Sequence, residues 1–521
     1  MKKILVSVLL LFAICLNLFM AVSCAPRGNL SSFVIPEEGF DTTTPVTITF
    51  YHTMGQHLRD VLDRYILEFQ ALYPNITVLH EQVGGYDDVR DQIKTELAVG
   101  AQPNIAYCYP DHVALYNMAK GTVALDGLIA STITVTRADG TTEILGFTDE
   151  QKNDFITGYY EEGKAFGDDK MYTLPFSKST EVLYYNKTFF DVCQKIYKSD
   201  IELNMKGEPV YQTNDKGEFI LDAEGNKQTK PNPNKGNETY NISVPTTWDE
   251  MEVVLGKIKT IDPDSTPLGY DSESNWFITM CEQLGTDYTS ATGEKFIFDN
   301  EENRAFVERF RDWYQKGYVT TQKLGGGYTS ALFKKKDTEA GKAYMCIGSS
   351  AGASNQRPNL TNGKYDFEVD ITSVPQVDPE NPKVISQGPS VCVFNKANPQ
   401  EVLASWLFVK YLTTSVEFQA EFSMVSGYMP VIKSVNDNPA YKEFLDNADG
   451  GANITALSAK VALEQHEAYY TSPAFIGSAE ARDQVGLLMQ KCFAEAATDV
   501  KAMIKKAFED AVAECKYQAG G

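Results

Sequence analysis

The pentapeptide from Gly348 to Gly352 (GSSAG) matches the G-x-S-x-G pattern, in which a nucleophilic serine lies on a sharp turn between a strand and a helix. The serine of that pattern would be Ser350. Asp446 or Asp449 and then His466 follow in the order that the triad of an α/β-hydrolase requires. The match is short, and no glycine motif for an oxyanion hole is evident upstream. A secreted serine hydrolase that uses Ser350 is therefore an alternative function, and the main interpretation is a protein that is not an enzyme.

Neighbouring carboxylates and candidate metal ligands give weaker signals. The pairs Asp87-Asp88 and Glu161-Glu162 could serve a glycosidase, but adjacent acids on a helix or loop are usually solvated surface charge. HExxH, Walker and GxGxxG motifs are absent, and the nine cysteines form no CxxC pair. With five histidines in all, the sequence predicts neither a metal site nor a cofactor. The cysteines of the body are expected to be buried free thiols.

Length and charge limit the classes of protein to which this chain can belong. With 521 residues the chain is too long for one compact core, so two or more domains are expected. Its formal net charge of −23 disfavours binding to nucleic acid or to anionic lipid. We therefore expect no nucleic-acid partner, and we expect the protein to be a monomer.

The N-terminal segment has the layout of a lipoprotein export signal. Two lysines precede an uncharged apolar run from Ile4 to about Met20, and small residues precede Cys24. The pattern predicts a signal peptide over residues 1–23, lipid on Cys24, and a membrane-anchored tether over residues 24–45. Ordinary secretory cleavage and an uncleaved anchor are the alternatives. Each of them places the body outside the cytoplasm, at the outer face of the cell membrane or in the periplasm.

The body of the chain alternates strands with helices. Apolar residues alternate in short segments and recur at helical spacing in the longer segments between them. This order predicts βαβ units, and hence an α/β fold class with mainly parallel sheets flanked by helices. The predicted strands are 46–51, 76–79, 104–109 and 343–347, and the predicted helices are 58–72, 89–99, 304–316, 399–412 and a nearly continuous 480–516.

The polar stretch 197–242 interrupts this alternation. It contains a ten-residue near-repeat, in which Lys206-Gly-Glu and Lys216-Gly-Glu match in register. Repeated turn-forming residues predict a surface β-hairpin insertion outside the α/β body. A segment that begins at Asp222 faintly matches a calcium loop but lacks the downstream Glu, so a plain turn is favoured.

Seven short motifs follow one another in the order found in a known family. They are Phe50–Met54, Phe69–Ile76, Tyr172–Lys187, Pro245–Glu250, Lys342–Ser350, Gly388–Ser390 and Ser426–Pro430. Each motif by itself is weak, but seven in one order are specific. From about Val46 to its C-terminus, apart from 197–242, the chain resembles the family 1 extracellular solute-binding proteins of bacterial ABC importers. That group includes maltodextrin and glycerol-3-phosphate receptors.

The resemblance implies a two-lobed fold of the type II periplasmic-binding-protein kind, with a mainly parallel sheet flanked by helices in each lobe. The N-terminal lobe would comprise 46–176 and 372–424, and the C-terminal lobe 177–371 and 425–521. A solute would bind in the interlobe cleft and be captured by hinge closure, without covalent chemistry. A permease of the ABC type would then be the second partner.

Within such a cleft, sugar recognition needs aromatic faces for C–H surfaces and short polar groups for hydroxyls. In open α/β sheets, ligands lie beyond the carboxyl ends of the strands. Tyr86 and Tyr109 could instead be surface tyrosines, Trp276 could belong to the core, and Ser349 and Ser350 could only cap a helix. The candidate ligand-binding residues are Tyr51, His52, Tyr86, Tyr109, Asp111, Ser177, Thr180, Trp276, Ser349, Ser350, Gly388 and Tyr428.

In motif order the chain is most similar to the glycerol-3-phosphate receptors, yet the departures fall on ligand residues. The acidic residue that follows the methionine of the first motif in the family is Gly55 here. The family's late phosphate-binding arginine aligns near Phe475, and Arg482 is the arginine nearby. Because a buried phosphate without a cation is costly, we expect a carbohydrate ligand that is a neutral mono- or oligosaccharide. A glycan-binding surface adhesin with the same fold is a further alternative.

Overall fold

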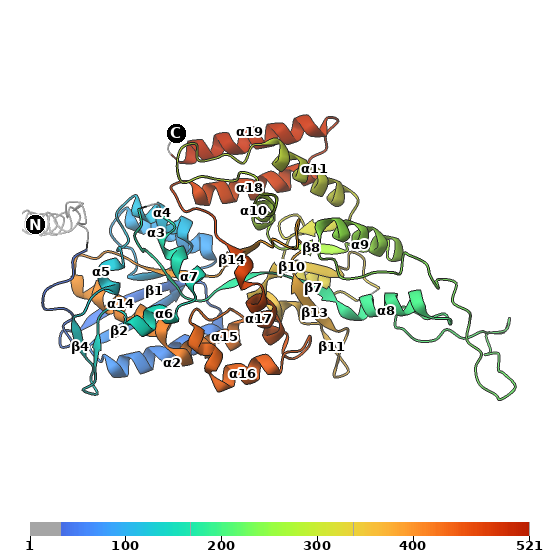
Figure 1. Cartoon of the computed structure of the whole chain (residues 1–521), viewed down its shortest axis with the longest axis horizontal. Helices are drawn as coiled ribbons and strands as arrows, with labels where there is room; N and C mark the ends of the chain where they lie inside the picture. The colour runs from blue at the N-terminus through green and yellow to red at the C-terminus, as the bar shows by residue number, and fades with distance from the viewer. Residues whose placement is uncertain (1–32, 167, 337, 520–521) are drawn as a thin grey trace, which may run out of the picture.

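The computed structural model describes residues 33–166, 168–336 and 338–519, and these form two α/β halves that lie side by side (Figure 1). The predicted signal peptide, Cys24 and the first part of the predicted tether lie outside the described residues. Within the described ranges, no helix is both long and apolar enough to cross a membrane.

The first half, at the left of Figure 1, is built on a five-stranded sheet. Its strands are β1 (Val46–His52), β2 (Ile76–Gln82), β3 (Ile105–Cys108), β6 (Leu174–Pro175) and β15 (Ser390–Val393). The strand order is β2-β1-β3-β15-β6, in which β1 is parallel to β2 and β3 and β15 is antiparallel to β3. The carboxyl ends of β1 and β3 therefore meet at one edge, as the sequence predicts for βαβ units.

Helices surround this sheet, and a small β4–β5 hairpin (Thr134–Thr136, Thr142–Ile144) lies beside them. The buried residues of the first helix, among them Leu58, Leu62 and Phe69, recur every three or four positions, so one apolar face packs on the sheet. The helices are α2 (Gln56–Leu72), α3 (Tyr86–Leu97), α4 (Pro110–Asn117), α5 (Asp126–Ile129), α6 (Asp149–Asp154), α7 (Thr157–Glu161), α14 (Pro399–Thr414), α15 (Val416–Ser426) and α16 (Pro439–Asp446).

The second half is built on a larger mixed sheet. Its strands are β7 (Ser179–Asn186), β8 (Leu268–Tyr270), β9 (Val319–Thr321), β10 (Met345–Ser349), β13 (Val369–Ser373), β14 (Val384–Gln387) and β16 (Tyr469–Tyr470). The order is β16-β14-β7-β10-β8-β9, and β13 also pairs with β7. Strand β8 is parallel to β9 and β10, whereas β7 is antiparallel to β10, β13 and β14. The short pair β11 (Leu360–Thr361) and β12 (Lys364–Tyr365) lies apart.

The helices of the second half include one difference from the sequence-based expectation. The nearly continuous helix predicted over 480–516 is two helices that pack on each other, because the chain leaves the helical path after Ala494 and re-enters it at Val500. The helices are α8 (Lys187–Lys198), α9 (Trp248–Ile261), α10 (Glu273–Leu284), α11 (Glu301–Gln315), α12 (Ser330–Phe333), α13 (Ala353–Gln356), α17 (Ile454–Glu464), α18 (Ser478–Ala494) and α19 (Val500–Gln518).

Two chain crossings between the halves meet at a buried ion pair. Lys178 lies between β6 and β7 and is fully buried. Its Nζ donates to Glu162 Oε2 at 2.5 Å and to the carbonyl oxygen of Gly388, which lies in the second crossing between β14 and β15. Gly388 has φ of +90°, and a Cβ there would lie 2.5 Å from the carbonyl oxygen of Ser177. Only glycine fits this close approach, so Gly388 has a backbone role at the crossing.

The hydrophobic cores place a third crossing later than the sequence predicts. Met429, Val431 and Tyr441, which the sequence assigns to the C-terminal lobe, pack into the core of the first half. Ile454, in α17, packs with Val182 of β7 in the second half. We therefore propose that the lobe boundary predicted at residue 425 lies after α16. We also propose that the boundary predicted at residue 372 lies near Gly388, because β13 and β14 pair with β7 in the second sheet and β15 pairs with β3 in the first.

The stretch 197–242 projects from the second half as an arm, seen at the lower right of Figure 1. It folds as three successive turns rather than as one β-hairpin, with isolated antiparallel bridges such as Tyr211↔Thr229. Each turn begins with an Asn or Asp side chain, at 204, 214 and 222, that accepts the backbone N–H groups two and four residues ahead. The near-repeat in the sequence therefore encodes a repeated turn.

Candidate functional site

A cavity of about 670 Å³ lies between the two halves and is lined by residues of both. The first half contributes residues from the start of α3 and from the chain just after β3, and the second half contributes residues that follow β8 and β10. These positions are the carboxyl ends of parallel strands, where the geometry of an open sheet leaves a crevice. We call this cavity the cleft.

Three tyrosines form an aromatic wall on the first half. Tyr86 and Tyr109 have their ring centroids 4.8 Å apart, and the hydroxyls of Tyr86 and Tyr428 are 3.2 Å apart. Burial raises the pKa of all three phenols, so they are neutral hydroxyls at physiological pH. The wall therefore offers flat apolar faces edged by hydroxyls. The sequence predicted all three residues, and the structure brings them together.

The opposite wall is polar and includes a buried carboxylate. Glu181 accepts the hydroxyl of Tyr270 at 2.6 Å and the side-chain amide of Asn275 at 2.9 Å. Asn275 in turn accepts a guanidinium N–H of Arg482 at 2.8 Å. Burial raises the pKa of Glu181 to about 7 and also raises the pKa of Asp271. The wall thus presents carboxyl oxygens that can accept hydrogen bonds from the hydroxyl groups of a ligand.

The raised pKa of Glu181 predicts a pH dependence of stability. The carboxyl group has an ordinary pKa of 4.5, so between about pH 4.5 and 7 the folded chain holds a proton that the unfolded chain releases. The free energy of unfolding is expected to fall by about 2–3 kcal/mol over this range, and this contribution should vanish in Glu181→Gln. Urea unfolding of the two proteins at pH 4.5, 6 and 8 measures it. The exposed control Glu467→Gln should follow the wild type, and a constant difference between wild type and Glu181→Gln would contradict the assignment.

Two further predicted residues, Asp111 and Ser349, also line the cleft. Asp111 lies in the first turn of α4, whose helical N-terminus favours an acidic side chain. The Ser349 hydroxyl accepts the backbone N–H of Ala351 at 3.3 Å, so this serine caps a short helix as well as facing the cleft.

Other predicted residues lie behind the cleft. Tyr51 donates its hydroxyl to Glu96 at 3.3 Å on the far side of β1. His52 is buried against His80, with 2.8 Å between ring nitrogens, and burial lowers its pKa to about 3. Neither residue is among those that line the cleft, because Tyr51 packs with Val89 of α3 and the His52 ring packs on His80 of β2.

Trp276 was predicted as a sugar-stacking residue, and the structure places it in the core instead. Its ring is fully buried, with centroids 4.7 Å from Tyr270 and 4.3 Å from Phe310. The side chain points inward because α10 turns its apolar face to the second core, and this burial removes Trp276 from the ligand set.

The remaining predicted residues belong to the crossings. Ser177 and Thr180 are buried there, and the Thr180 hydroxyl donates to the carbonyl oxygen of Ile385 at 2.8 Å. Gly388 shapes the backbone as described above. These residues connect the halves and do not line the cleft.

Ser350 is arranged for structure rather than for nucleophilic attack. It is fully buried, and its hydroxyl accepts the backbone N–H of Thr180 at 3.2 Å. His466, the histidine that a triad would need, is exposed and bonds through Nδ1 to the carbonyl oxygen of Leu463. The geometry therefore does not favour the serine hydrolase. Among the described residues, no group of three or more His, Cys, Asp or Glu side chains could hold a metal ion.

Sequence reasoning missed the acidic wall of the second half. Glu181 lies inside one of the quoted motifs, and Asp271 and Asn275 follow the three-residue strand β8. A polar cluster directly after a short apolar strand was the available signal. The sequence identified Arg482 only as the arginine near the position of the family's phosphate-binding arginine, because its place in the wall of the cleft depends on how α18 docks.

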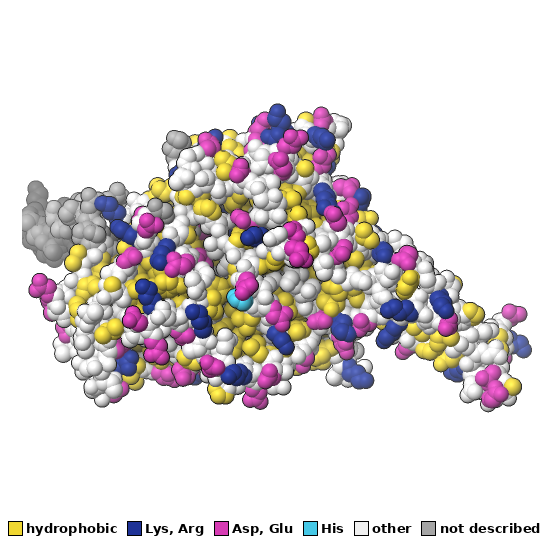
Figure 2. Space-filling model, viewed as in Figure 1, with side chains coloured by type: hydrophobic (Ala, Val, Ile, Leu, Met, Phe, Trp, Pro, Cys, Tyr) yellow, Lys and Arg dark blue, Asp and Glu magenta, His cyan; other side chains and the backbone are white. Residues whose placement is uncertain are grey.

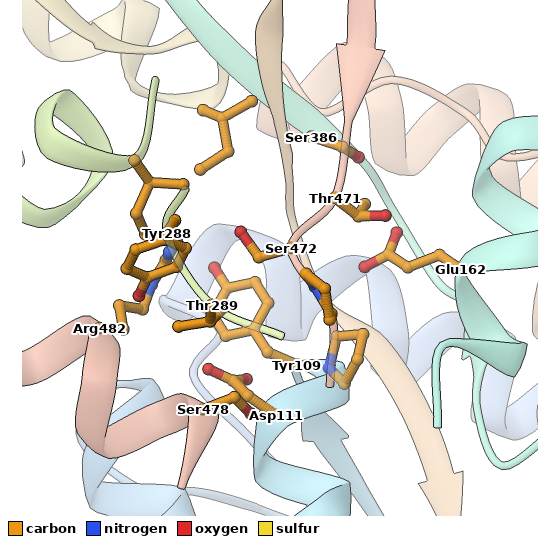
Figure 3. Close-up of a pocket in the computed structure, with 14 residues that line it drawn as sticks. Tyr109, Asp111, Glu162, Tyr288, Thr289, Ser386, Thr471, Ser472, Ser478 and Arg482 are labelled. Atoms are coloured by element: carbon orange, nitrogen blue, oxygen red, sulfur yellow. The ribbon is translucent and has the colours of Figure 1, made fainter. Parts of the chain in front are cut away.

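A smaller chamber of about 60 Å³, which we call the inner chamber, adjoins the cleft and shares Tyr109, Asp111 and Arg482 with it (Figure 3). Its lining also includes six residues with hydroxyl groups, Tyr288, Thr289, Ser386, Thr471, Ser472 and Ser478. The hydroxyls of Tyr288, Thr289, Ser386 and Ser472 are buried and have no hydrogen-bond partner among the described residues. Glu162, the partner of Lys178, also reaches this chamber.

Comparisons with known proteins agree on the kind of molecule. A family model described as bacterial extracellular solute-binding protein matches residues 64–448. The sn-glycerol-3-phosphate-binding periplasmic protein UgpB of Shigella flexneri is 21% identical over 421 residues, covering 78% of this chain and 80% of the relative. UgpB of Escherichia coli strain UTI89 is 26% identical over 416 residues, covering 78% of each chain.

Solved structures share the fold at low sequence identity. The cyclic alpha-maltosyl-1,6-maltose binding protein of Arthrobacter globiformis has a TM-score of 0.62 and 18% identity, covering 91% of this chain and 100% of its own. UgpB of Mycobacterium tuberculosis in complex with glycerophosphocholine has a TM-score of 0.64 and 15% identity, covering 91% and 99%. The fold is thus the two-lobed, type II periplasmic-binding-protein fold that the sequence predicted. Because the family model matches most of this chain, the chain belongs to the bacterial extracellular solute-binding proteins.

Proposed function

We propose that this protein captures a neutral mono- or oligosaccharide in the cleft and delivers it to an ABC permease by hinge closure. The observation that carries the proposal is the pairing of two unlike walls. The tyrosines 86, 109 and 428 on one half face Glu181, Asp271 and Asn275 on the other. Aromatic faces suit the C–H surfaces of a sugar ring, and carboxylate and amide groups suit its hydroxyls.

The charges of the cleft favour a neutral ligand over a phosphate. Among the described residues that line it, five are carboxylates but only two are arginines. Arg90 already contacts three acids, Asp87 at 3.1 Å, Asp91 at 2.9 Å and Asp483 at 3.4 Å. Arg482 is the other arginine of the cleft, and the negative charge of Asp111 offsets its positive charge. An anionic group would thus enter a field that is negative on balance.

The names of the similar proteins include both a neutral sugar and a phosphate compound as ligands. The Arthrobacter protein is named for a cyclic maltosyl-maltose, and the Mycobacterium protein is named with glycerophosphocholine. The tyrosine wall and the excess of acids in this cleft support the first class for this chain. Figure 2 shows basic and acidic side chains interspersed over the face in view.

Closure follows from the position of the cleft. A ligand that touches both halves binds the closed arrangement better than the open one, and this difference in affinity shifts the equilibrium toward closure. Cross-half contacts such as Arg90–Asp483 are made only when the halves are together. In this proposal, lipid on Cys24 and the tether hold a monomeric receptor near its permease.

A thermal-shift screen tests the proposal. Neutral mono- and oligosaccharides, sn-glycerol 3-phosphate and glycerophosphocholine are compared at equal concentrations. At least one neutral sugar is expected to raise Tm by about 2–5 °C at 100-fold its Kd, because a ligand that binds only the folded state stabilises it by about 2.7 kcal/mol. A rise in Tm with a phosphate compound only would overturn the neutral-sugar assignment.

A blocked cleft provides the control. Gly352 lines the cleft, and a Cβ there would meet nothing within 4 Å. Gly352→Phe is therefore expected to fold while its ring occupies the cleft, and the sugar-dependent rise in Tm should disappear. A rise that persists in Gly352→Phe would mean that the sugar stabilises the protein elsewhere.

A further inference from the structure

One aromatic side chain of the cleft has no partner within the protein. Tyr328 lines the cleft, yet 67% of the residue is exposed, and it makes no hydrogen bond and no ring contact with any other described residue. Aromatic side chains contribute most to binding when their faces become buried. Tyr328 therefore offers a flat surface, open to solvent, that a ligand in the cleft can cover.

The backbone around Tyr328 is held in place on both sides. Tyr328 lies between β9 and α12, and the next residue, Thr329, donates its backbone N–H and its hydroxyl to Asp271 Oδ1 at 2.8 Å and 2.7 Å. On the other side, the backbone N–H of Gly327 donates to the carbonyl oxygen of Gln322 at 2.9 Å. Since a tyrosine side chain has only two rotatable angles, its ring loses little conformational freedom when a ligand covers it.

Tyr328 approaches the aromatic wall from the opposite half. It belongs to the second half, whereas Tyr428 packs against the core of the first half. Burial raises the pKa of Tyr428, and the nearby phenol of Tyr328 raises it further, so the two phenols approach each other across the cleft. A ligand that lies on the aromatic wall and grows across the cleft therefore meets Tyr328.

Two amide side chains with free hydrogen-bonding groups line the same cleft. They belong to Gln322, which precedes the loop that carries Tyr328, and to Asn355 of α13. Asn355 is exposed and Gln322 is half-buried, and neither side chain forms a hydrogen bond with another described residue. An amide both donates and accepts, as sugar hydroxyls require. Together with Tyr328, these amides provide the aromatic and polar groups that bind one sugar ring.

The volume of the cleft exceeds what one sugar ring needs. A water occupies about 10–15 Å³ of a cavity, so the roughly twelve water-sized groups of a hexose occupy about 120–180 Å³. The cleft measures about 670 Å³. A monosaccharide on the aromatic wall therefore leaves room for at least one further ring.

We propose that Tyr328 stacks on the second ring of the bound carbohydrate, with Gln322 and Asn355 bonding its hydroxyls, so that the ligand is an oligosaccharide of at least two rings. This inference rests on the proposed function and narrows its ligand class. The aromatic wall holds the first ring. The affinity for an oligosaccharide therefore depends on Tyr328, whereas the affinity for its monosaccharide unit does not.

Sugars with the same units but different lengths test this selectivity. The probes are D-glucose with maltose, maltotriose and cellobiose, D-xylose with xylobiose, D-mannose with mannobiose, and D-galactose with galactobiose. Kd is measured by calorimetry for the full-length protein without its predicted signal peptide. In at least one series the wild type is expected to bind the oligosaccharide about tenfold or more tightly than the monosaccharide, because a second ring covers a further aromatic face.

Substitutions at position 328 assign the selectivity to the ring. Tyr328→Ser should weaken oligosaccharide binding by about tenfold and leave monosaccharide binding unchanged. Its Tm should stay within about 1 °C of the wild type, because the ring makes no contact that stabilises the fold. Tyr328→Phe keeps the ring and should keep the selectivity. Tyr517→Ser, on an exposed tyrosine of α19, is the matched control and should change neither affinity.

A tryptophan at this position reports contact with the ligand directly. The four native tryptophans are buried, so iodide should quench mainly the new indole of Tyr328→Trp. Saturation with the oligosaccharide is expected to protect this indole from iodide, and saturation with the monosaccharide to leave it accessible.

The outcomes separate the two proposals. If monosaccharides bind as tightly as their oligosaccharides, the inference is overturned while the proposed function stands. A selectivity that survives in Tyr328→Ser, or an indole that iodide still quenches when the oligosaccharide is bound, also overturns it. If no sugar of any series binds, the neutral-sugar function and the second-ring subsite both fail.

Discussion

Lys178→Met is expected to lower the free energy of unfolding by about 3–5 kcal/mol, because removal of one partner of a buried ion pair leaves the other charge buried and uncompensated. Both side chains are almost completely inaccessible, with exposed fractions of 0% for Lys178 and 5% for Glu162, and the Nζ–Oε2 distance is 2.5 Å. Urea unfolding followed by circular dichroism at neutral pH measures the loss.

Two variants make this result interpretable. The double variant Lys178→Met/Glu162→Gln removes both charges and should recover most of the lost stability. The neighbouring pair Lys164–Glu161, at 2.9 Å, is exposed, so Lys164→Met should change stability by less than about 1 kcal/mol. Equal effects of Lys178→Met and Lys164→Met would show that the pair at the crossings is solvated.

The same pair bears on ligand capture. Lys178 lies between β6 and β7 and also donates to Ser390 Oγ at 3.3 Å in the second crossing, so it ties two crossing segments together. Glu162 reaches from the first half to the inner chamber. Loss of the pair therefore loosens the region about which the halves move, and the ligand-induced rise in Tm should be reduced in the variant as well.

Tyr109→Ala is expected to weaken sugar binding by about 10- to 100-fold. Tyr109 lines both the cleft and the inner chamber, and its ring packs on Tyr86 with 4.8 Å between centroids. Loss of an aromatic face that becomes buried on binding costs about 1.5–3 kcal/mol, and each 1.4 kcal/mol corresponds to tenfold in Kd. Calorimetric titration with the sugar found in the screen measures the change.

Matched tyrosine substitutions control this measurement. Tyr109→Phe keeps the ring and should retain most of the affinity, whereas Tyr517→Ala, on an exposed residue of α19, should leave the affinity unchanged. Unaltered binding by Tyr109→Ala would place the sugar outside the aromatic wall and would contradict the proposed site.

The fold was largely predictable from local patterns. Alternating apolar residues over 46–51 and helical spacing over 58–72 correspond to β1 and α2, since each pattern reflects burial of one face of one element. The prediction failed where a local pattern does not decide the outcome. The helical pattern of 480–516 did not reveal that the chain breaks at 495–499 so that α19 can pack back on α18.

The candidate site was predictable in part. Tyr86, Tyr109 and Tyr428 were predicted and meet in the cleft, whereas Trp276 is a core residue. An aromatic residue near the end of an element can face either a cleft or a core, and the sequence pattern is the same in both cases. Glu181, by contrast, lines the cleft although the sequence did not predict it. An acidic residue within a buried strand is unexpected from the sequence, and only the structure shows that Tyr270 and Asn275 bond to it.

The sequence by itself determined the alternation of strands and helices, the order of the family motifs and the layout of the N-terminal segment, because these depend on residues that are close together in the chain. The tertiary structure decided which side chains face the cleft, the pairing of Lys178 with Glu162 and the four orphan hydroxyls of the inner chamber. These features join residues from elements such as β14, the loop after α10 and the segment after β16. These residues come together only when whole elements pack on one another, and no single stretch of the sequence encodes that packing.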